Sequence, residues 1–442
     1  MKKTQKEDDR KLTGQNEIAQ KDGIEVSMKT EENQHEKHER QPEATGERSR
    51  PYDLVLFGAT GFTGRLTAHY IAEHARREQL AWAIAGRRRD ALEQIREECR
   101  HMSGGSRPPD LIVADVHQPE TIRAMAASTR IILNTAGPFA IYGPAVVTAA
   151  AEAGTHYTDI TGEPDFINNT YLKLDETARK TGSVIVNACG FDSIPADLTV
   201  WHAVRHLPAD EGVAVRCYAE TRARFSGGTL STVIEALYRR SKGEKPVRIH
   251  NPRHHDAPVI SRKIHRTHSS RLGKTSRRWA IPMPVSDIDI VRRSAMRMPD
   301  HYGHAFSYAQ FFLLKGFSNV VKLAVFFGAT AVLVRFDWFR AWIRRKTPAG
   351  TGPSEEVRKK SWFQMTAMAV SSGGKRCAMR MEGGDPGYDE TAKMVAEASF
   401  CLLEMDKGRA LGGGVMTPAE AMAVPLMKRL RDAGIQMAEV EF

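Results

Sequence analysis

The chain has 442 residues, of which 41% are hydrophobic, and it carries a formal net charge of +11. This length exceeds that of one ordinary domain, and the apolar content is sufficient for two cores. Five scattered cysteines without Cys-x-x-Cys spacing exclude a disulfide framework and a cysteine-based zinc site. We therefore expect no metal and a reducing, cytoplasmic location.

The first segment, 1–50, is almost entirely polar or charged, and its opposite charges nearly cancel. It lacks the apolar stretch of a secretory signal. A segment of this composition cannot bury enough apolar surface to fold. We predict a disordered charged tail in front of the first domain.

A glycine-rich turn at 58–64 is the most informative motif of the chain. It follows a strand-like run, Leu54–Phe57, and leads into a helix-like segment, Phe62–Arg77. In this context Gly58 permits a tight turn, Gly61 lets the backbone approach a pyrophosphate, and Gly64 lets the helix lie close to the strand. The free amides and the positive dipole end of the helix then hold the anion. The predicted dinucleotide contacts are Gly58, Ala59, Thr60, Gly61, Phe62, Thr63 and Gly64.

Strand-like and helix-like segments alternate from residue 52 to residue 187. The strand-like runs are continuously apolar, as expected for parallel strands that are covered on both faces. This pattern predicts an α/β fold with a doubly wound parallel sheet, a Rossmann domain, over 51–210. The expected strands are 54–57, 81–85, 111–114, 131–134, 155–160 and 183–187, and the expected helices are 62–77, 89–100, one from 119, 144–153 and 165–180.

After about residue 210 the alternation ends. We expect a second, α+β substrate domain over 211–385, and C-terminal helices over 386–442 that pack back on the Rossmann domain. The expected elements are strands at 213–221, 362–370 and 376–382, a helix at 388–405 and a last helix that starts at Thr417-Pro418. A Ser-Gly-Gly-Thr sequence at 226–229 opens a further helix and is either a second anion site or a flexible turn.

The positive charge is concentrated in a basic segment, 239–300, which contains 16 Lys/Arg and 5 Asp/Glu residues. It is either a solvated loop or an electropositive face for an anionic partner. The anionic partners considered are CoA, an acyl carrier protein, anionic lipid and nucleic acid. The apolar segment that follows favours a lipid-like or carrier-bound partner, and no nucleic-acid module is recognisable, so we expect no nucleic-acid partner.

That apolar segment covers 305–345. Its uncharged centre, Leu323–Val334, has twelve residues, whereas a membrane-spanning helix needs about twenty. Arginines and two tryptophans, Trp338 and Trp342, follow it, as in interfacial anchors. Two interpretations stay open. The favoured one is a buried or dimer-forming helix, in line with an expected homodimer, and the other is peripheral membrane contact through 320–346.

The type of dinucleotide is indicated at the end of the second strand. An NAD site places a carboxylate there, but this chain has Arg87 and two further arginines, with no carboxylate before Asp90. Because guanidinium groups bind phosphate oxygens bidentately, the sequence predicts NADP(H), with Arg87 on the 2′-phosphate. After the third strand, Asp115 is predicted to accept from the adenine amine. After the fourth, the small residues Ala136, Gly137 and Pro138 leave room for the nicotinamide half.

These motifs together resemble the saccharopine dehydrogenase-like superfamily. Besides the glycine-rich turn, the resemblance rests on Asn134-Thr-Ala-Gly-Pro-Phe139, on Tyr157-Thr-Asp-Ile-Thr-Gly-Glu163 and, most specifically, on Gly190-Phe-Asp-Ser-Ile-Pro-Ala-Asp197. It extends well over 52–240 and loosely beyond. Within the superfamily the chain is most similar to saccharopine dehydrogenase-like oxidoreductases and bacterial trans-acting enoyl reductases. The resemblance implies NADP(H) and a hydride step on a lipid-like substrate.

We therefore expect an NADP(H)-dependent oxidoreductase, an enoyl reductase acting on a lipid or polyketide acyl intermediate that is carried on CoA or an acyl carrier protein. Two alternatives stay open. One is an amino-acid dehydrogenase of the saccharopine type, and the other is a non-catalytic, membrane-associated protein that binds NADPH.

The proton donor of such a reaction is not fixed by the sequence. Tyr157 lacks the lysine of a Tyr-x-x-x-Lys pair, so the short-chain reductase mechanism is not assigned. Asp192 and Ser193 begin a helix, where a capping role is an equal alternative. His156 is interpreted as structural. The candidate donors near the strand ends are Tyr157, Asp159, Glu163, Asp192 and Ser193.

Overall fold

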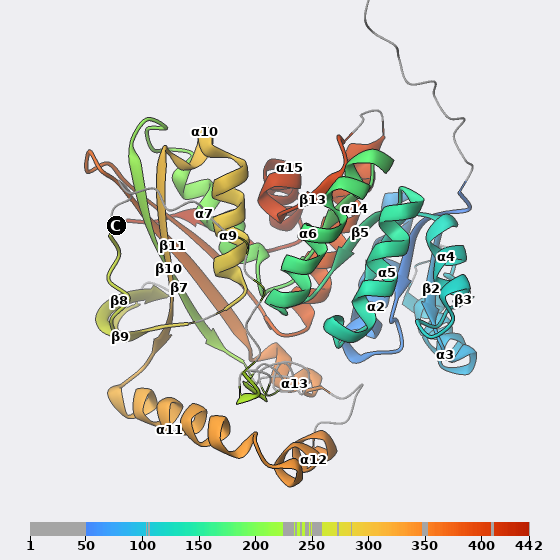
Figure 1. Ribbon diagram of the computed structural model, residues 1–442, viewed down its shortest axis with the longest axis horizontal. Coiled ribbons are helices and arrows are strands. Elements are labelled where there is room, and N and C mark those ends of the chain that lie inside the picture. Colours follow the sequence, from blue (N-terminus) through green and yellow to red (C-terminus); the bar gives the residue numbers. More distant parts are fainter. Residues whose placement is uncertain are drawn as a thin grey trace, which may run out of the picture. The chain divides into compact units, whose positions relative to one another are not determined.

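The computed structural model describes the chain from Arg50 onward, with gaps at 103, 105–106, 224–233, 235–236, 239–240, 244–246, 248, 250–258, 272–273, 284, 347–351, 408–410 and 442. The predicted tail and the 226–229 motif lie outside the described residues, except for Arg50. The described chain contains two seven-stranded sheets with helices between and beside them (Figure 1).

The first sheet is entirely parallel, with the strand order β13-β6-β5-β4-β1-β2-β3. Strands β2 and β3 lie on one side of β1 and strands β4 to β6 on the other, so the strand order changes direction between β1 and β4 and the loops that follow these two strands meet at the carboxyl edge. The strands are β1 (Tyr52–Phe57), β2 (Trp82–Gly86), β3 (Asp110–Val113), β4 (Thr129–Asn134), β5 (His156–Asp159), β6 (Val184–Val186) and β13 (Gly414–Met416).

Helices cover both faces of this sheet, which explains its continuously apolar strands. Leu54 and Leu56 of β1 enter one core, whereas Val55 and Phe57 enter the other. The first core is closed by α2 (Phe62–Glu78), α3 (Arg89–Met102) and α14 (Asp389–Asp406), and the second by α4 (Pro119–Ala127), α5 (Phe139–Ala153) and α6 (Pro164–Thr181). The predicted Rossmann fold is confirmed.

Helix α5 begins five residues before the predicted start at Pro144. The carboxylate of Glu163 accepts the backbone N–H groups of Phe139 and Ala140, both at 2.8 Å. These are amides of the first helical turn, which otherwise lack partners. A side chain from the next loop therefore extends the helix, which the local sequence does not reveal.

The second sheet is mixed, with the order β14-β12-β11-β7-β10-β9-β8, and only β7 and β10 pair in parallel. Its strands are β7 (Gly212–Arg222), β8 (His265–Arg271), β9 (Lys274–Pro282), β10 (Ala305–Leu314), β11 (Trp362–Ser371), β12 (Arg376–Gly383) and β14 (Gln436–Glu439). This is the expected second α+β layer. The described part of the basic segment is not a plain loop, because it forms β8, β9 and a helix.

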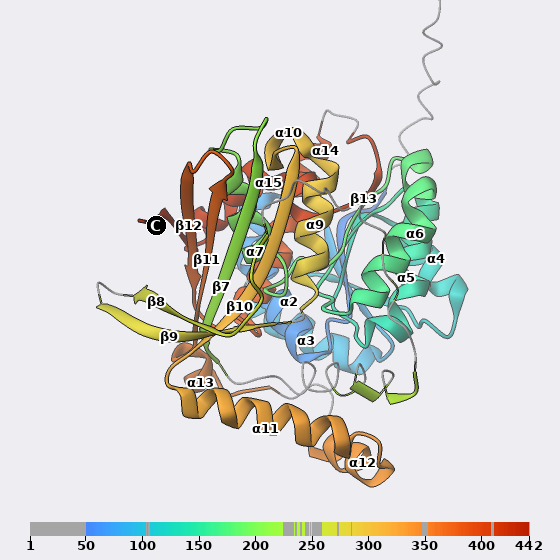
Figure 2. The same cartoon turned by 60° about the vertical axis from the view of Figure 1, so that its left-hand side comes forward.

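One face of the second sheet is covered by α7 (Ile194–Val204), α9 (Asp287–Arg297) and α10 (Pro299–Tyr302), as Figure 2 shows. Every residue of α7 is buried. Since α7 packs against β11 and β12, the chain passes from the first sheet to the second soon after β6.

The C-terminal segment joins the two sheets. Strand β13 pairs with β6 of the first sheet, and β14 pairs with β12 of the second. Between them runs α15 (Pro418–Asp432), whose start is fixed by a capping box in which Thr417 accepts the N–H of Glu420. Residues 50–442 accordingly form one compact unit.

The apolar segment 305–345 is not one continuous helix. Its first part is β10, and the rest forms α11 (Phe317–Leu333) and α12 (Asp337–Lys346), followed by the short α13 (Glu355–Lys359). Within α11 only Val320 and Thr330 are buried, so the interpretation as a buried helix is wrong. None of the described helices is long and apolar enough to cross a bilayer.

Candidate functional site

The three glycines of the turn after β1 are constrained in different ways. Gly58 has φ +88°, and a Cβ there would lie 2.7 Å from the amide nitrogen of Ala136. A Cβ on Gly64 would collide with the carbonyl oxygen of Gly58. A Cβ on Gly61 would meet only that oxygen, at 3.3 Å, so its other sides are open. The turn is thus tightly packed at its ends and open in the middle, where a pyrophosphate is expected.

The start of α2 fits an anion. Its N-cap is Gly61, which provides no side-chain cap, and its first turn contains no acidic residue. The first amides of the helix therefore keep their donor capacity and the positive dipole end stays uncompensated. The side chain of Ala59 is buried, so only its backbone can face a ligand.

The residues predicted for the adenosine half lie at the same carboxyl edge. Arg87 follows β2, is exposed, and forms no ion pair with any described residue, whereas Arg89 is paired with Glu93 at 3.1 Å. Asp115 follows β3, and its carboxylate accepts the N–H of His117 at 3.0 Å. Arg87 and the equally exposed Arg88 thus have no ion pair with a described residue, and Arg87 is the nearer of the two to the end of β2.

The loop after β4 is held firmly beside the glycine-rich turn. The side-chain oxygen of Asn134 accepts the N–H of Ala136 at 2.8 Å, and its amide group donates to the hydroxyl of Tyr157 at 2.9 Å. The Gly137–Pro138 peptide bond is cis. Because Ala136 also packs against Gly58, the wall predicted for the nicotinamide half adjoins the predicted pyrophosphate position.

Two of the candidate proton donors are completely buried. Tyr157 and Asp159 have no exposed surface. Burial raises the pKa of Tyr157 well above its usual value. Burial also raises the pKa of Asp159 to about 6, although its carboxylate accepts the backbone N–H groups of Ala188 and Thr161. Both residues sit inside the fold at β5, so they stabilise the strand end and do not reach a substrate.

The other candidates near the strand ends are also structural, with one exception. Glu163 holds the start of α5, as described above. The hydroxyl of Ser193 donates to the carbonyl oxygen of Asp192 at 2.7 Å and does not cap α7. The Nδ1 atom of His156 accepts the N–H of Val184 at 3.0 Å, consistent with a structural role.

The exception is Asp192, whose side chain is exposed. A Cβ on Gly162 would lie 2.7 Å from its Oδ2 atom, so the carboxylate reaches the loop after β5. No described residue forms a hydrogen bond or ion pair with this carboxylate. The surrounding protein nevertheless displaces much of the bulk water and raises its pKa. An accessible, unpaired carboxyl group with a raised pKa is what a proton donor requires.

The second sheet supplies neighbours that the sequence did not reveal. The hydroxyl of Tyr308 donates to the Gln310 side chain at 2.8 Å, which in turn donates to the Asp287 carboxylate at 2.7 Å. Burial, and then the charge of Asp192, raises the pKa of Asp287 well above its usual value. The two carboxyl groups are therefore electrostatically coupled. They are 95 positions apart in the chain, so only the fold brings them together.

Residues from the loops that connect elements of the second half of the chain also contact the glycine-rich turn. The ring of Phe62 meets that of Tyr388 edge to face, with centroids 4.7 Å apart. A Cβ on Gly352 would collide with the same Phe62 ring. The predicted cofactor turn is consequently bordered by residues from the late part of the chain.

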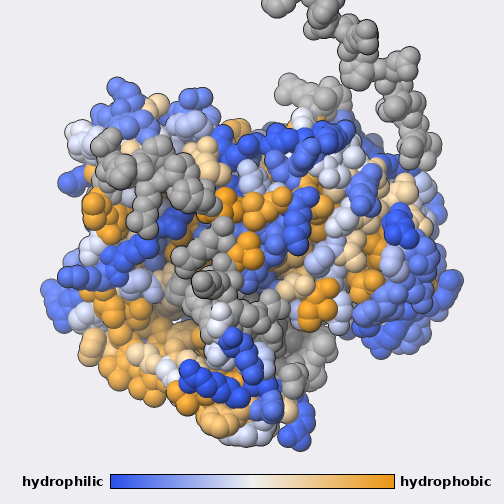
Figure 3. All heavy atoms as spheres, in the orientation of Figure 1, coloured by the Kyte–Doolittle hydropathy of each residue, from blue (hydrophilic) through white to orange (hydrophobic). Residues whose placement is uncertain are grey.

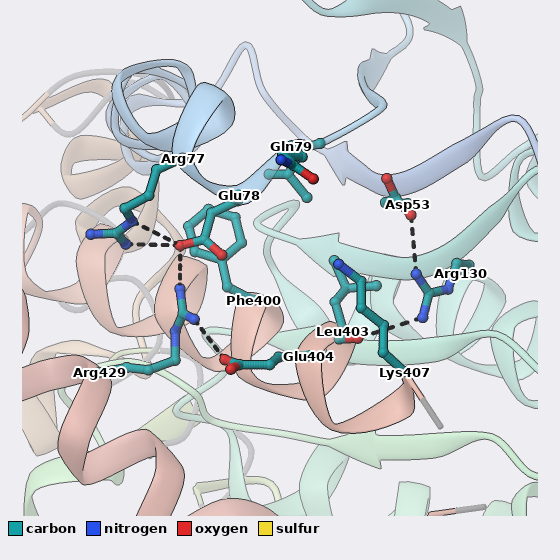
Figure 4. A pocket seen from close by; sticks show the side chains of 11 residues that line it. Asp53, Arg77, Glu78, Gln79, Arg130, Phe400, Leu403, Glu404, Lys407 and Arg429 are labelled. Atoms are coloured by element: carbon teal, nitrogen blue, oxygen red, sulfur yellow. Dashed lines mark hydrogen bonds and ion pairs between the residues drawn. The ribbon is translucent and has the colours of Figure 1, made fainter. Parts of the chain in front are cut away.

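A cavity of about 400 Å³ lies at the opposite, amino edge of the first sheet (Figure 4). Most of its charged lining is paired: Arg130 binds Asp53 at 3.1 Å, and Arg429 binds Glu78 at 2.6 Å and Glu404 at 3.0 Å. These pairs connect α2, α14 and α15. The cavity lies at the amino ends of the strands, whereas the glycine-rich turn lies at their carboxyl ends. We interpret the cavity as the place where these three helices are joined by ion pairs, and not as a substrate site.

One cluster in the described chain has the composition of a metal site: His202, His206 and Glu439. The two imidazole Nε2 atoms lie 3.6 and 3.8 Å from the same Glu439 oxygen. However, the Nε of Arg205 donates to the His206 Nε2 at 3.3 Å, which places a cation at the ligand atom. This arrangement does not favour a metal ion.

Comparison with known proteins places this geometry in a family. The sequence profile of the saccharopine dehydrogenase NADP-binding domain matches residues 54–186. A Mycobacterium tuberculosis protein assigned as a trans-acting enoyl reductase is 33% identical over 415 residues, covering 88% of this chain and 97% of the relative. The chain belongs to the saccharopine dehydrogenase-like family. The matched domain binds NADP, as predicted, and the chain is therefore an NADP-binding member of an oxidoreductase family.

Other saccharopine dehydrogenase-like relatives match over similar lengths. Proteins from Mycobacterium bovis and Mycobacterium ulcerans, both named trans-acting enoyl reductase, are 32% and 31% identical, and the alignments cover 88% and 87% of this chain and 97% of each relative. Among solved structures, saccharopine dehydrogenase (L-Glu forming) from Saccharomyces cerevisiae shares 13% identity, with a TM-score of 0.49, over 88% of this chain and 100% of that chain.

Proposed function

We propose that this protein is an NADPH-dependent enoyl reductase that acts on an acyl or polyketide thioester. The full-length similarity to mycobacterial proteins with that name supports the proposal most strongly, because it covers both sheets and not only the nucleotide turn. We further propose that the thioester is carried on CoA or an acyl carrier protein, and that the predicted residues of the turn and Arg87 contact the cofactor.

Reduction of an α,β-unsaturated thioester breaks the carbon–carbon π bond. A hydride adds to the β-carbon and a proton to the α-carbon, and the thioester stays intact. Bound NADPH supplies the hydride. The protein must hold the acyl chain against the carboxyl edge of the first sheet and deliver the proton.

In this proposal Asp192 delivers the proton. Asp192 is an exposed residue, its carboxylate lies next to Gly162 at the carboxyl edge, and this carboxylate has no hydrogen bond or ion pair with a described residue. A raised pKa keeps more of it protonated than an ordinary aspartate. The proton of its carboxyl group would pass to the α-carbon, and solvent would reprotonate the carboxylate before the next turnover.

Asp287 is proposed to position and tune Asp192. It is buried, bonded to Gln310, and its own pKa is raised by burial and by the charge of Asp192. Two carboxyl groups in one site disfavour simultaneous ionisation. Replacing Asp287 by Asn would therefore alter the pH dependence of the reaction more than its maximum rate.

The test is oxidation of NADPH by the full chain with enoyl thioesters of several lengths, presented on CoA and on an acyl carrier protein. We expect turnover with at least one carrier and little with saccharopine and NADP+. Silence with every enoyl thioester, in protein shown to bind NADPH, would overturn the proposal. Turnover with saccharopine alone would assign the protein to the amino-acid dehydrogenases instead.

A further inference from the structure

We propose that the exposed apolar face of α11, together with the basic residues around it, docks this protein on the surface of an anionic lipid bilayer. We call this region the apolar ledge, defined as residues 315–346. It comprises α11, α12 and the residues that immediately precede and join them, and it plays no part in the proposed reaction. The inference is therefore independent of the proposed function.

The outer face of α11 is apolar along its whole length. Phe317, Val321 and Val325 recur at four-residue spacing, and Val332 follows seven residues later on the same face. Phe317 is 55% exposed and Val325 is 64% exposed. Helices in water normally turn such a stripe toward a core. Here the stripe faces outward, and Figure 3 shows apolar surface gathered over this helix.

The opposite face of α11 holds the helix to the protein. Val320 and Thr330 are buried, and Val334, just after the helix, is completely buried in a small cluster with Ile234 and Ile343. Phe317, which is half-exposed on the outer face, also packs with its ring on Trp279 of β9, with centroids 5.0 Å apart. The inner contacts fix the orientation of the ledge, so the fold itself keeps the apolar face exposed.

The charges of the ledge match an anionic surface. Between Lys315 and Lys346 the sequence contains seven basic residues and one acidic residue, Asp337. The carboxylate of Asp337 is bound by Arg340. Each Lys or Arg near an anionic leaflet contributes to binding, so this excess favours acidic phospholipid headgroups.

Helix α12 adds the aromatic residues that favour the interface between lipid and water. Trp338 is 62% exposed and Trp342 is also exposed. Tryptophan rings prefer the headgroup level of a bilayer, where an apolar ring and a polar N–H are both accommodated. Both views of the ribbon place α11 and α12 together, beyond the two sheets (Figures 1 and 2).

The dimensions exclude a spanning segment. Seventeen helical residues extend about 25 Å, short of the about 30 Å of a hydrocarbon core. Lys322 also lies in the middle of α11. The helix is therefore expected to lie in the plane of the surface, with its outer face among the headgroups and upper acyl chains.

A second copy of this chain fits the ledge less well. A twofold interface brings identical patches together, so the basic residues of two copies would face each other. The ledge offers only the one carboxylate described above to offset them. A bilayer with acidic headgroups supplies the missing negative charge, and a homodimer through the ledge does not.

Vesicle cosedimentation of the full-length protein tests the inference. We expect binding to vesicles of phosphatidylcholine with phosphatidylglycerol, and much weaker binding to phosphatidylcholine alone or at high salt. Val325→Glu combined with Val332→Glu should abolish binding. Lys322→Glu combined with Arg335→Glu should lower the partition coefficient by about tenfold or more.

The matched control is Val424→Glu, because Val424 is 59% exposed on α15, away from the ledge. This variant should bind vesicles like the original chain. Equal NADPH affinity and equal melting temperature in all variants exclude misfolding as the cause of lost binding. Binding that is absent in the original chain, or unchanged by the ledge variants, would overturn the inference. A dimer that the Val325→Glu and Val332→Glu variant dissociates, without any vesicle binding, would assign the ledge to a second copy instead.

Discussion

Gly61 and Gly64 are three residues apart in the same turn, yet the structure requires glycine at each for a different reason. At Gly64 a side chain has no room, because the carbonyl oxygen of Gly58 occupies that space. At Gly61 a Cβ would meet only the Gly58 carbonyl oxygen, at a tight 3.3 Å, and we expect it to project toward the position of the pyrophosphate. Stability and cofactor binding can therefore be separated by substitution.

Gly64→Ala should lower the free energy of unfolding by about 1–3 kcal/mol, because overpacking displaces α2 from β1. Gly61→Ala should leave the free energy of unfolding nearly unchanged and weaken NADPH binding by about tenfold or more. Urea denaturation and fluorescence titration with NADPH measure the two effects. Equal losses of stability in both variants would contradict the distinction.

Substitution of Arg87 tests whether the protein prefers NADPH to NADH. Arg87→Ala should weaken NADPH binding by about ten- to a hundredfold, the value of a charge-assisted contact, and should hardly alter NADH binding. Arg123→Ala is a control, since Arg123 is an exposed arginine on α4 and its loss changes the net charge equally. If the substitution weakened NADPH and NADH binding equally, Arg87 would not be the residue that contacts the 2′-phosphate.

Substitution of Asp192 tests whether this residue delivers the proton to the substrate. Asp192→Asn should reduce kcat by about 10²–10⁴-fold without changing NADPH affinity. Because the pKa of Asp192 is raised, its acid form persists to higher pH than that of an ordinary aspartate. The rate should fall as pH rises through that pKa, and the variant should lose this dependence. Asp300→Asn, at an exposed position on α10, should keep it. A pH profile that is unchanged in Asp192→Asn would exclude this role.

At the scale of elements, α14 is fastened to the first sheet by charge as well as by apolar packing. Near its C-terminus, Asp406 lies 3.4 Å from the His156 Nε2 and 2.6 Å from the Arg130 guanidinium. These two partners, His156 first, lower the pKa of Asp406 to about 2 from its ordinary 3.8. The contacts connect the C-terminal segment to the starts of β4 and β5.

The lowered pKa gives a pH-dependent stability with a definite sign. The unfolded chain binds a proton at Asp406 near pH 4, whereas the folded chain does so only near pH 2, so the stabilisation is present above about pH 4 and is lost toward pH 2. Because the site is partly exposed, Asp406→Ala should cost about 1 kcal/mol at pH 7. The difference should shrink as pH falls from 4 to 2. Asp432→Ala, an exposed control on α15, should show neither effect.

The elements differ in how far the sequence predicts them. The strands of the first sheet follow from continuous apolar runs that enter two cores, and the start of α15 follows from its Thr417-Pro418 cap. The true start of α5 and the short strands β13 and β14 did not emerge, because distant partners determine them. The sequence left the exposure of α11 undecided, since an apolar helix in isolation is equally compatible with a core and with a surface.

At the scale of the whole molecule, the C-terminal segment makes the two sheets one unit by adding a strand to each. This explains why residues expected to bind the cofactor could be grouped from the sequence, whereas those proposed for the substrate could not. The cofactor residues follow successive strands of one sheet, so their order in the chain gives their neighbourhood. Asp192 precedes α7 and Asp287 begins α9, and no local pattern encodes the electrostatic coupling between them.

The central claim is that hydride from NADPH and a proton from the protein reach adjacent carbons of an enoyl thioester. It is tested most directly by mass spectrometry of the product formed with NADPH deuterated at nicotinamide C4, in ordinary water and in heavy water. We predict one deuterium at the β-carbon from the labelled cofactor and one at the α-carbon from heavy water, and labelled product should form about 10²–10⁴-fold more slowly in Asp192→Asn. Full NADPH binding with the double bond intact under every condition would contradict it.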